Sequence, residues 1–509
     1  MTTTDDTGEG SFRDAITSTN ASSDFDNKIT FNSTLSGTIT LSSPLPDITT
    51  RVKIIGPGRS QLTVDAGTAA GVLKFVGDGG LVSYVSDLSL SGGDAVITAV
   101  DAPNLVIDRT TISGGGDAGL DIEETPDDID ENYISLVTMS NSTVTGNAVG
   151  VLGHGDLTYF NATDTAVDDN DVGISLEGGG GGLGPGSISG NTEGGVQVAD
   201  ANFGVINAEV TDNHGTGGIR AVSVDGSPSD DGLPHTNVTS STISGNTSDT
   251  AGGGISAEGL LHIYSSTVSG NSAPSGGGVD VPDSSYAYTY FSTFSGNTAT
   301  GAGGALHLGD GAFAALVSST ISGNTAAPGG GGGVSAPATS AYILPYNTIV
   351  ANSSGPDLVG DAAVAAYYSL IEDPGTVSIV GSENITGVDP ALGPLANNGG
   401  STETLKPAPS SRAVDAGYAP VFPDNDTVRD QRGILRPQDL PGVPNVPGGD
   451  GSDIGAVELT PSEGPPFTPP PASPVPSTTS THKPKCKKKK HKRSAESAKK
   501  KCKKKRKRK

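Results

Sequence analysis

A Gly-His-Gly-Asp segment comes closer than any other part of the sequence to the residue types of a hydrolytic site. It places His154 and Asp156 two residues apart, and a pair of adjacent carboxylates, Asp127 and Asp128, precedes it by about 25 residues. Inverting hydrolysis of a glycosidic bond needs one carboxylic acid and one carboxylate on opposite sides of that bond. These four residues therefore define one hypothesis, a polysaccharide hydrolase.

The sequence around these residues weakens that hypothesis. The segment resembles the Gly-His-Gly of polygalacturonases, but no Arg-Ile-Lys type of substrate clamp follows His154. The two aspartates belong to the acidic stretch Asp121 to Glu131, for which we predict an extended loop and not a strand end. With 74 glycines in the chain, a histidine between two glycines is a weak signal. We expect a non-catalytic protein, with a hydrolase or lyase as the alternative.

Three further aspartates, Asp168, Asp169 and Asp171, are the candidate ligands for a calcium ion. A polysaccharide lyase needs carboxylates that hold Ca²⁺ and a basic side chain on the same face, and Arg220 follows two repeats later. A calcium site needs six or more oxygen ligands from converging loops. Aspartates are also common in ordinary turns. A structural calcium ion is the one cofactor that we consider.

Tyr286, Tyr288 and Tyr290 alternate along one segment and are followed by Phe291. In a strand, alternation places the three tyrosines on one face. If that face points outward, the rings can stack on sugars; if it points inward, they belong to the core, which we favour. Elsewhere, no His/Cys cluster has the spacing of a metal site, and the glycine runs lack the Gly-Lys-Ser/Thr ending of a phosphate-binding loop.

These candidate residues are all carried by a repeat. Thr-Ile-Ser-Gly-Asn occurs at 242–246 and 320–324, with close variants at 143–147, 267–271 and 293–297 and a further copy, Ser-Ile-Ser-Gly-Asn, at 187–191. From Asn147 to Asn352 the closing asparagines are 21 to 33 residues apart when the weaker copies at Asn170 and Asn213 are included. This is the length of one coil of a parallel β-solenoid.

Two columns of polar side chains are predicted to stack from coil to coil. Serine stands two residues before the central apolar residue, so that both side chains face the same way. The Gly-Asn pair bends the chain at low cost. Stacked coils then place one asparagine above another in an amide ladder. Its predicted members are Asn147, Asn191, Asn246, Asn271, Asn297 and Asn324.

The ends of the solenoid differ from the repeats. Ser11 to Asn20 is predicted as a helix whose face of Phe12, Ala15, Ile16 and Thr19 covers the first coil. We predict an N-terminal cap with first strands at 1–80, β-helix repeats at 81–383, a non-repeating region at 384–459, a Pro/Ser/Thr-rich linker at 460–481 and a basic tail at 482–509. The expected fold is all-β, a right-handed parallel β-helix with a helical cap and a disordered C-terminal tail.

Charge is divided unequally between the tail and the rest. Residues 482–509 contain 18 Lys and Arg and one acid, whereas residues 1–481 contain 13 Lys and Arg and 55 acids. A run of like charge does not fold alone and binds an anionic surface. Lacking interleaved aromatic residues, this tail favours an anionic cell envelope over a specific nucleic-acid site. It also holds both cysteines, Cys486 and Cys502, which either remain free thiols or pair.

The non-repeating region resembles a known family. Asp430-Gln-Arg-Gly433, Arg436-Pro437 and Asp453-Ile-Gly-Ala-Val-Glu458 are similar to the C-terminal signature of the choice-of-anchor Q domain proteins, and Gly8 to Asn20 is similar to their N-terminal start. The family comprises exported bacterial right-handed β-helix proteins with a pectin-lyase-like fold, attached to the surface by varied devices. The resemblance implies an extracellular or cell-surface protein with a leader that precedes Met1.

The combined prediction is a surface-attached β-helix protein for adhesion or carbohydrate contact. A Pro-rich stalk and the basic tail tether it, and an extracellular polysaccharide is its expected partner. No run approaches the 18 apolar residues of a membrane span.

Overall fold

The computed structural model describes residues 1–24, 26–77, 82–101, 104–124, 135–224, 234–419 and 428–464. Met1–Pro465 form one compact unit, and the rest of the chain forms a second unit that lies outside the described ranges. Residues 465–481 of the linker, the basic tail, both cysteines and the pair Asp127 and Asp128 are therefore not described.

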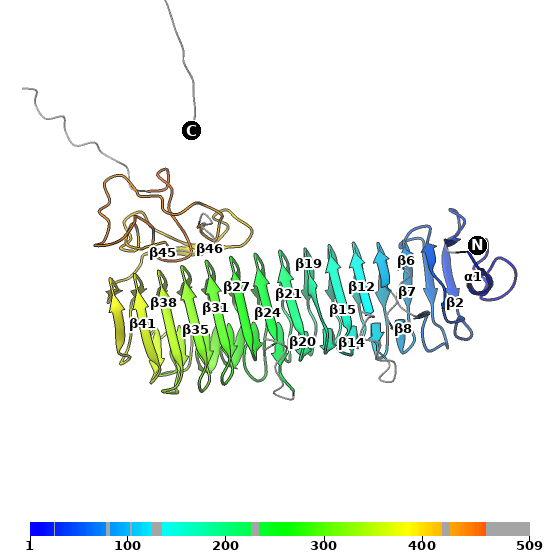
Figure 1. The fold of residues 1–509 in the computed structure, drawn as a ribbon, viewed down its shortest axis with the longest axis horizontal. Helices are drawn as coiled ribbons and strands as arrows, with labels where there is room; N and C mark the ends of the chain where they lie inside the picture. Colours follow the sequence, from blue (N-terminus) through cyan, green and yellow to red (C-terminus); the bar gives the residue numbers. More distant parts are fainter. Residues whose placement is uncertain are drawn as a thin grey trace, which may run out of the picture. The chain divides into compact units, whose positions relative to one another are not determined.

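The first unit is the expected right-handed parallel β-helix (Figure 1). Each regular coil contributes one strand to each of three parallel sheets, which we call sheets A, B and C in the order in which the chain visits them. Inward side chains from all three sheets form one continuous apolar core that runs from Phe12 to Ile371. A solenoid of this kind grows by adding coils, because each coil contacts only its neighbours.

Sheet A has 15 strands, and every neighbouring pair in it is parallel. Its strands are β1 Asn27–Thr30, β3 Val52–Ile55, β6 Val82–Ser86, β9 Asn104–Asp108, β12 Ser135–Ser140, β15 Thr158–Thr163, β18 Gly180–Leu183, β21 Asn202–Ile206, β24 His235–Thr239, β27 Leu260–Tyr264, β31 Tyr286–Tyr290, β35 Phe313–Val317, β38 Tyr342–Tyr346, β41 Ala363–Tyr367 and β43 Ile379–Ser382.

Sheet B also has 15 strands, most of them only three residues long. They are β2 Gly37–Thr40, β4 Leu62–Asp65, β7 Ser89–Ser91, β10 Thr111–Ser113, β13 Thr143–Thr145, β16 Thr165–Asp168, β19 Gly186–Ser189, β22 Glu209–Thr211, β25 Thr242–Ser244, β28 Thr267–Ser269, β32 Thr293–Ser295, β36 Thr320–Ser322, β39 Ile349–Ala351, β42 Leu370–Ile371 and β44 Ile385–Thr386.

Sheet C has 12 strands. They are β5 Leu73–Val76, β8 Ala95–Val100, β11 Ala118–Glu123, β14 Val149–His154, β17 Val172–Glu177, β20 Gly194–Ala199, β23 Ile219–Val222, β26 Ile255–Ala257, β30 Val279–Val281, β34 Leu306–Leu308, β37 Val334–Ala336 and β40 Leu358–Gly360. Two small sheets lie outside the three: parallel β29 Ser272–Ser275 with β33 Thr298–Ala302, and antiparallel β45 Leu392–Ala396 with β46 Thr404–Pro407.

An amide ladder runs along the turn between sheets B and C. From Asn147 to Asn324, each side-chain Nδ2 donates to Oδ1 of the asparagine one coil further, over 2.7 to 3.2 Å. The weaker repeat copies at Asn170 and Asn213 belong to the same column. Asn352 does not extend it, since it lies in the left-handed region with its backbone N–H bonded to Glu372.

The corner between sheets A and B consists of a single residue in the left-handed region. In twelve coils this residue is not glycine, and its φ lies between 46° and 59°, as at Phe291 and Tyr368. In six of these coils the next residue is a buried serine, whose Oγ accepts the backbone N–H of the corresponding residue one coil earlier; for example, the Ser241 N–H donates to Ser266 Oγ at 3.1 Å. The repeat predicted these inward serines but not the corner, because bulky residues in this conformation are uncommon.

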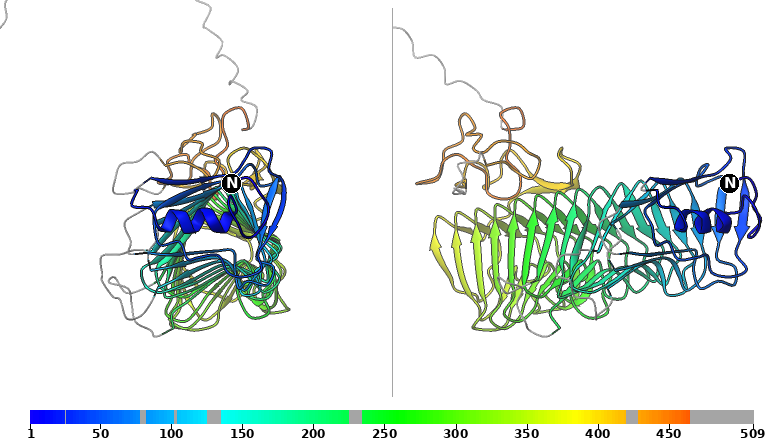
Figure 2. Two further views of the ribbon diagram at one scale, coloured as in Figure 1. Left: turned by 90° about the vertical axis from the view of Figure 1, so that its right-hand side faces the viewer. Right: turned by 45° about the vertical axis from the view of Figure 1, so that its right-hand side comes forward.

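The N-terminal end is covered by helix α1, Phe12–Asn20. Figure 2 shows the helix lying across the end of the solenoid. Ser11 caps it by accepting the Asp14 N–H, and the Phe12 ring packs on Phe31 with centroids 5.4 Å apart. The predicted helical cap is therefore present. The coils begin earlier than residue 81, because β1 to β4 already belong to sheets A and B.

The non-repeating C-terminal region folds back onto the outer face of sheet B. Gln431 Nε2 donates to Thr267 Oγ1 at 2.9 Å, and Thr293 Oγ1 donates to Gln431 Oε1 at 2.6 Å. The Ala456 N–H donates to Thr320 Oγ1 at 2.9 Å. The region thus covers three successive strands, β28, β32 and β36.

Candidate functional site

An uncharged aromatic surface covers the outside of sheet A toward its C-terminal end. Five consecutive strands, β27, β31, β35, β38 and β41, each present three outward side chains, and we call these fifteen residues the aromatic face. Eight of them are tyrosine or phenylalanine, and none is Asp, Glu, Lys or Arg. They are Leu260, His262, Tyr264, Tyr286, Tyr288, Tyr290, Phe313, Ala315, Val317, Tyr342, Leu344, Tyr346, Ala363, Ala365 and Tyr367.

The rings of the aromatic face contact one another from coil to coil. Phe313 stacks on Tyr342 with centroids 5.8 Å apart and planes 5° apart, and it also contacts Tyr288 at 5.5 Å. Tyr264 lies 6.3 Å from Tyr290. Aromatic pairs of this kind are each worth about 0.5–1.5 kcal/mol beyond the area that they bury. In the row of Tyr342, the next residue is Ala363, which is exposed.

The rings remain accessible to a ligand. Tyr264, Tyr286, Tyr342 and Tyr367 each expose 37 to 42% of their surface. A contiguous exposed patch of large apolar side chains usually marks a binding surface. Single exposed apolar residues, in contrast, are ordinary.

The preferred interpretation of the three tyrosines as core residues is wrong. In β31 the inward positions are taken by Ala287 and Thr289, which are buried, while Tyr286, Tyr288 and Tyr290 face outward. Alternation shows that the tyrosines share a face but does not say which face. Ala287 and Thr289 suit the interior because they lie beside Leu261 and Ile263 of the preceding coil.

Burial favours the neutral form of two titratable groups of the aromatic face, Tyr346 and His262. It raises the pKa of Tyr346 to about 12, with Tyr418, Tyr368 and Asp450 adding to the effect. It lowers the pKa of His262, and the neighbouring His235 lowers it further. A lowered pKa means that His262 stays uncharged to more acidic pH than an ordinary histidine.

The structure describes two of the four predicted hydrolytic residues, His154 and Asp156. His154 ends β14 and is half exposed, and its Nδ1 lies 3.5 Å from Glu177 Oε2 on the next coil. Asp156 is exposed in the following turn. Their proposed partners, Asp127 and Asp128, lie outside the described residues, as noted above.

The three aspartates of the calcium hypothesis make different interactions around the turn between sheets B and C. Asp168 Oδ1 accepts from the Ser189 N–H and hydroxyl, each at 2.9 Å. Asp169 has a φ of 57° and occupies the position that glycine holds in most other coils. Asp171 Oδ1 accepts from the Thr192 hydroxyl. Over the described ranges, no three His, Cys, Asp or Glu side chains are grouped to hold a metal ion.

Sheet C carries charged side chains on its outer face. Arg220 of β23 lies in the same row as Asp280 of β30 and His307 of β34. The His307 Nδ1 and the Asp280 Oδ1 are 2.8 Å apart. Arg220 lies on sheet C, whereas Asp168 ends β16 of sheet B, and Asp169 and Asp171 lie in the turn between these two sheets.

A cleft near the start of sheet C contains the carboxylate of Asp121, for which the sequence predicts a loop. The cleft measures about 330 Å³ and is lined by Asp94, Asp117, Asp121 and Glu123, among others. Asp121 and Glu123 belong to strand β11, and not to the extended loop predicted from Asp121 onward. Burial raises the pKa of Asp121 to about 7, with Glu123 contributing.

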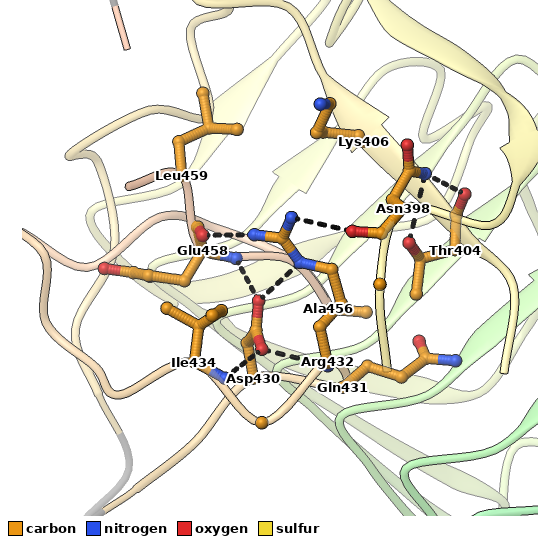
Figure 3. Close-up of polar contacts among 12 residues, drawn as sticks. Asn398, Thr404, Lys406, Asp430, Gln431, Arg432, Ile434, Ala456, Glu458 and Leu459 are labelled. Atoms are coloured by element: carbon orange, nitrogen blue, oxygen red, sulfur yellow. Dashed lines mark hydrogen bonds and ion pairs between the residues drawn. The ribbon is translucent and has the colours of Figure 1, made fainter. Parts of the chain in front are cut away.

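The residues of the C-terminal motifs meet in one buried network (Figure 3). Arg432 pairs with Asp430 at 3.1 Å and with Glu463 at 3.0 Å, and it donates to the backbone oxygen of Glu458 at 2.6 Å. Arg436, which is fully buried, pairs with Glu458 at 3.1 Å. The network ties three separate motifs together, and its charged groups are paired with one another, so we interpret it as structural.

Comparisons with known proteins find only weak similarity to solved structures. No protein-family model matches the sequence, and no curated protein matches it. The A-module of a mannuronan C-5 epimerase from Azotobacter vinelandii is 14% identical with a TM-score of 0.42, over 76% of this chain and 97% of that one. Tailspike protein 3 of bacteriophage CBA120 is also 14% identical, with a TM-score of 0.40 over 75% and 59% of the two chains.

A third solved structure is the catalytic unit of an α-1,3-glucanase from Streptomyces thermodiastaticus, 12% identical with a TM-score of 0.35, over 76% of this chain and 68% of that one. Likenesses at this level do not indicate what the present chain binds. Among the residues described, no helix is long and apolar enough to cross a membrane.

Proposed function

We propose that the protein binds carbohydrate through the aromatic face and is displayed outside the cell. The observation that carries the proposal is the group of eight outward Tyr and Phe rings on five successive strands of sheet A. The C–H groups of a sugar ring favour the electron-rich face of an aromatic ring. Tyrosine adds a hydroxyl group that can bond to a sugar hydroxyl.

A double substitution tests this proposal. Replacing Tyr286 and Tyr288 by Ala removes two neighbouring rings, each worth on the order of 1.5 kcal/mol when its surface is buried by a ligand. We therefore expect polysaccharide binding to weaken by about 100-fold or more. The chain has no tryptophan, so tyrosine fluorescence reports binding directly.

Tyr159→Ala is the matched control. Tyr159 faces outward on β15 of the same sheet but lies outside the aromatic face. Its loss should leave binding unchanged. If the control weakened binding as much as the double variant, or if the intact chain bound no glycan in a broad panel, the proposal would fail.

We place the protein in the choice-of-anchor Q family as part of the same proposal. Support comes from the C-terminal motifs, because Asp430, Arg432 and Glu458 belong to one buried network and Gln431 bonds to the solenoid. The motifs dock the C-terminal region on sheet B, which is a structural role. Membership would make the protein a non-catalytic surface protein for adhesion or carbohydrate contact.

Attachment through residues 482–509 is the last part of the proposal. Its 18 Lys and Arg are attracted to an anionic envelope, each contributing about 1 kcal/mol at low salt. Deleting these residues should release an intact rod into the medium, and high salt should do the same to the full chain. Unchanged surface retention after the deletion would exclude the tail as the anchor.

Hydrolysis of a polysaccharide is the second candidate function, and the cleft around Asp121 favours it. A carboxylic acid that keeps its proton near neutral pH is suited to general-acid catalysis. Asp121→Asn should then abolish the release of reducing ends from a polysaccharide panel. No release by the intact chain would leave carbohydrate binding alone.

A further inference from the structure

The surroundings of the aromatic face restrict the class of carbohydrate that it accepts. Between Arg220 and Lys406 the sequence contains no lysine and no arginine, but it contains fifteen Asp and Glu. All five strands of the aromatic face belong to this stretch. An acidic polysaccharide would therefore meet no positive side chain from these coils.

Carboxylates follow one edge of the aromatic face. Asp283, Asp310 and Asp361 are exposed in the turns that precede β31, β35 and β41, within three residues of Tyr286, Phe313 and Ala363. A carboxylate accepts hydrogen bonds and has none to donate when ionised. The hydroxyl groups of a sugar are suitable donors, whereas a second carboxylate would be repelled.

The dimensions of the aromatic face suit a linear chain better than a protein. With a rise of roughly 3.3 Å per residue and a strand spacing of roughly 4.8 Å, it extends about 13 Å along the strands and about 19 Å across them. A stable protein interface covers on the order of 800 Å² on each partner. The face provides well under that area, but its successive rings continue for five coils along the solenoid axis.

We infer that the aromatic face takes a neutral, extended polysaccharide that lies across the strands, along the solenoid axis. The inference rests on the proposed carbohydrate binding and adds the class of the ligand. The rings supply stacking surface at about one sugar per coil. The carboxylates at the edge bond to hydroxyl groups and exclude uronate chains.

The decisive experiment compares neutral and acidic hexasaccharides on the full chain. The probes are the β-1,4-linked hexamers of glucose, xylose and mannose and the hexamer of galacturonate, titrated by calorimetry at about 20 mM and about 500 mM NaCl. We expect at least one neutral hexamer to bind with the same Kd at both salt concentrations. The galacturonate hexamer should bind at least about 10-fold more weakly at low salt.

The outcomes separate this inference from the function on which it rests. Tighter binding of the galacturonate hexamer at low salt, lost at high salt, would overturn the neutral class and leave carbohydrate binding intact. Binding of none of the four probes would overturn both. Equal binding of neutral and acidic hexamers would also reject the electrostatic selection.

A charge placed in the aromatic face provides a second measurement. Ala363→Lys introduces a cation at an exposed position of the face. Affinity for the galacturonate hexamer should rise about 5-fold at low salt, while affinity for the neutral hexamer stays the same. Thr138→Lys adds the same charge to β12 of the same sheet and should have no effect. An equal response of both variants would contradict the inference.

Discussion

The two halves of sheet A differ in their outward side chains but have similar inward side chains. Strands β9, β12 and β15, which we call the polar half, present nine outward side chains that include only one aromatic ring, that of Tyr159. The five strands of the aromatic face present eight. The inward side chains of both halves are nearly all apolar and belong to the same continuous core.

This difference separates the inward residues, which build the fold, from the outward residues, which are available for function. Inward rungs are under one constraint everywhere, since each must fit the rung above and the rung below. Outward positions in a solenoid are free to vary, and polar residues suffice for solubility. A cluster of large rings on the outside is therefore not needed for folding, and it indicates a ligand.

Removing an inward side chain should have the largest effect on stability, and it should be the same in both halves. Ile107 of β9 and Ile263 of β27 are both fully buried. Replacing either by Ala should lower the free energy of unfolding by about 2–5 kcal/mol, because a cavity is left in a packed core. Urea unfolding of the two variants measures this. A much smaller loss for Ile263→Ala would mean that the aromatic face, and not the core, stabilises its half.

Breaking the amide ladder should have the second largest effect on the free energy of unfolding. Asn170 and Asn271 each accept two hydrogen bonds from the asparagine before them and donate to the one after. Alanine at either position leaves buried N–H groups without a partner, at a cost of about 1–3 kcal/mol. Thermal unfolding should show equal losses for the two variants. Unequal losses would show that the halves also differ inside.

One pH effect on stability should come from the C-terminal region. Burial raises the pKa of Asp415 to about 7, and Asp453 and Asp439 contribute. Because the folded state favours the protonated carboxyl, this stabilisation is complete below about pH 4 and is lost as the pH rises toward 7. Calorimetry should show a higher unfolding temperature at pH 5 than at pH 7.5.

Asp415→Asn should reduce this pH dependence, whereas Asp361→Asn, at an exposed position, should leave it unchanged. The same dependence in a variant that lacks residues 384–464 would place the effect elsewhere in the solenoid.

Outward rings should contribute least to stability. Tyr288→Ser and Tyr159→Ser should each lower the free energy of unfolding by about 1 kcal/mol or less, because both side chains are on the surface. Only Tyr288→Ser should weaken glycan binding. A loss of several kcal/mol for Tyr288→Ser in urea would reassign the aromatic face to a structural role.

Much of the scaffold was predictable from the repeat. The spacing of the asparagines predicted the coils, and the serine two residues before each Ile predicted a buried hydroxyl, as at Ser266. The cap followed from the pattern of Phe12 and Ile16. These features are local or repeat along the chain, so neighbouring coils confirm one another.

Other features depend on contacts that no single repeat contains. Asp169 resembles a calcium ligand in sequence but replaces a glycine in a turn. The partners of Gln431, Thr267 and Thr293, precede it by more than a hundred residues. Neither relation has a fixed spacing from which it could be inferred.

By itself, the sequence determined that this chain stacks coils and which side chains share a face. Alternation along a strand does not show which set of side chains faces the core, because the inward and outward sets repeat with the same period of two. Only the closing of three sheets around one core decided that Ala287 and Thr289 lie inside and that the tyrosines of β31 meet the solvent. The volume enclosed by neighbouring coils has room for the small residues, and the rings are left on the outside.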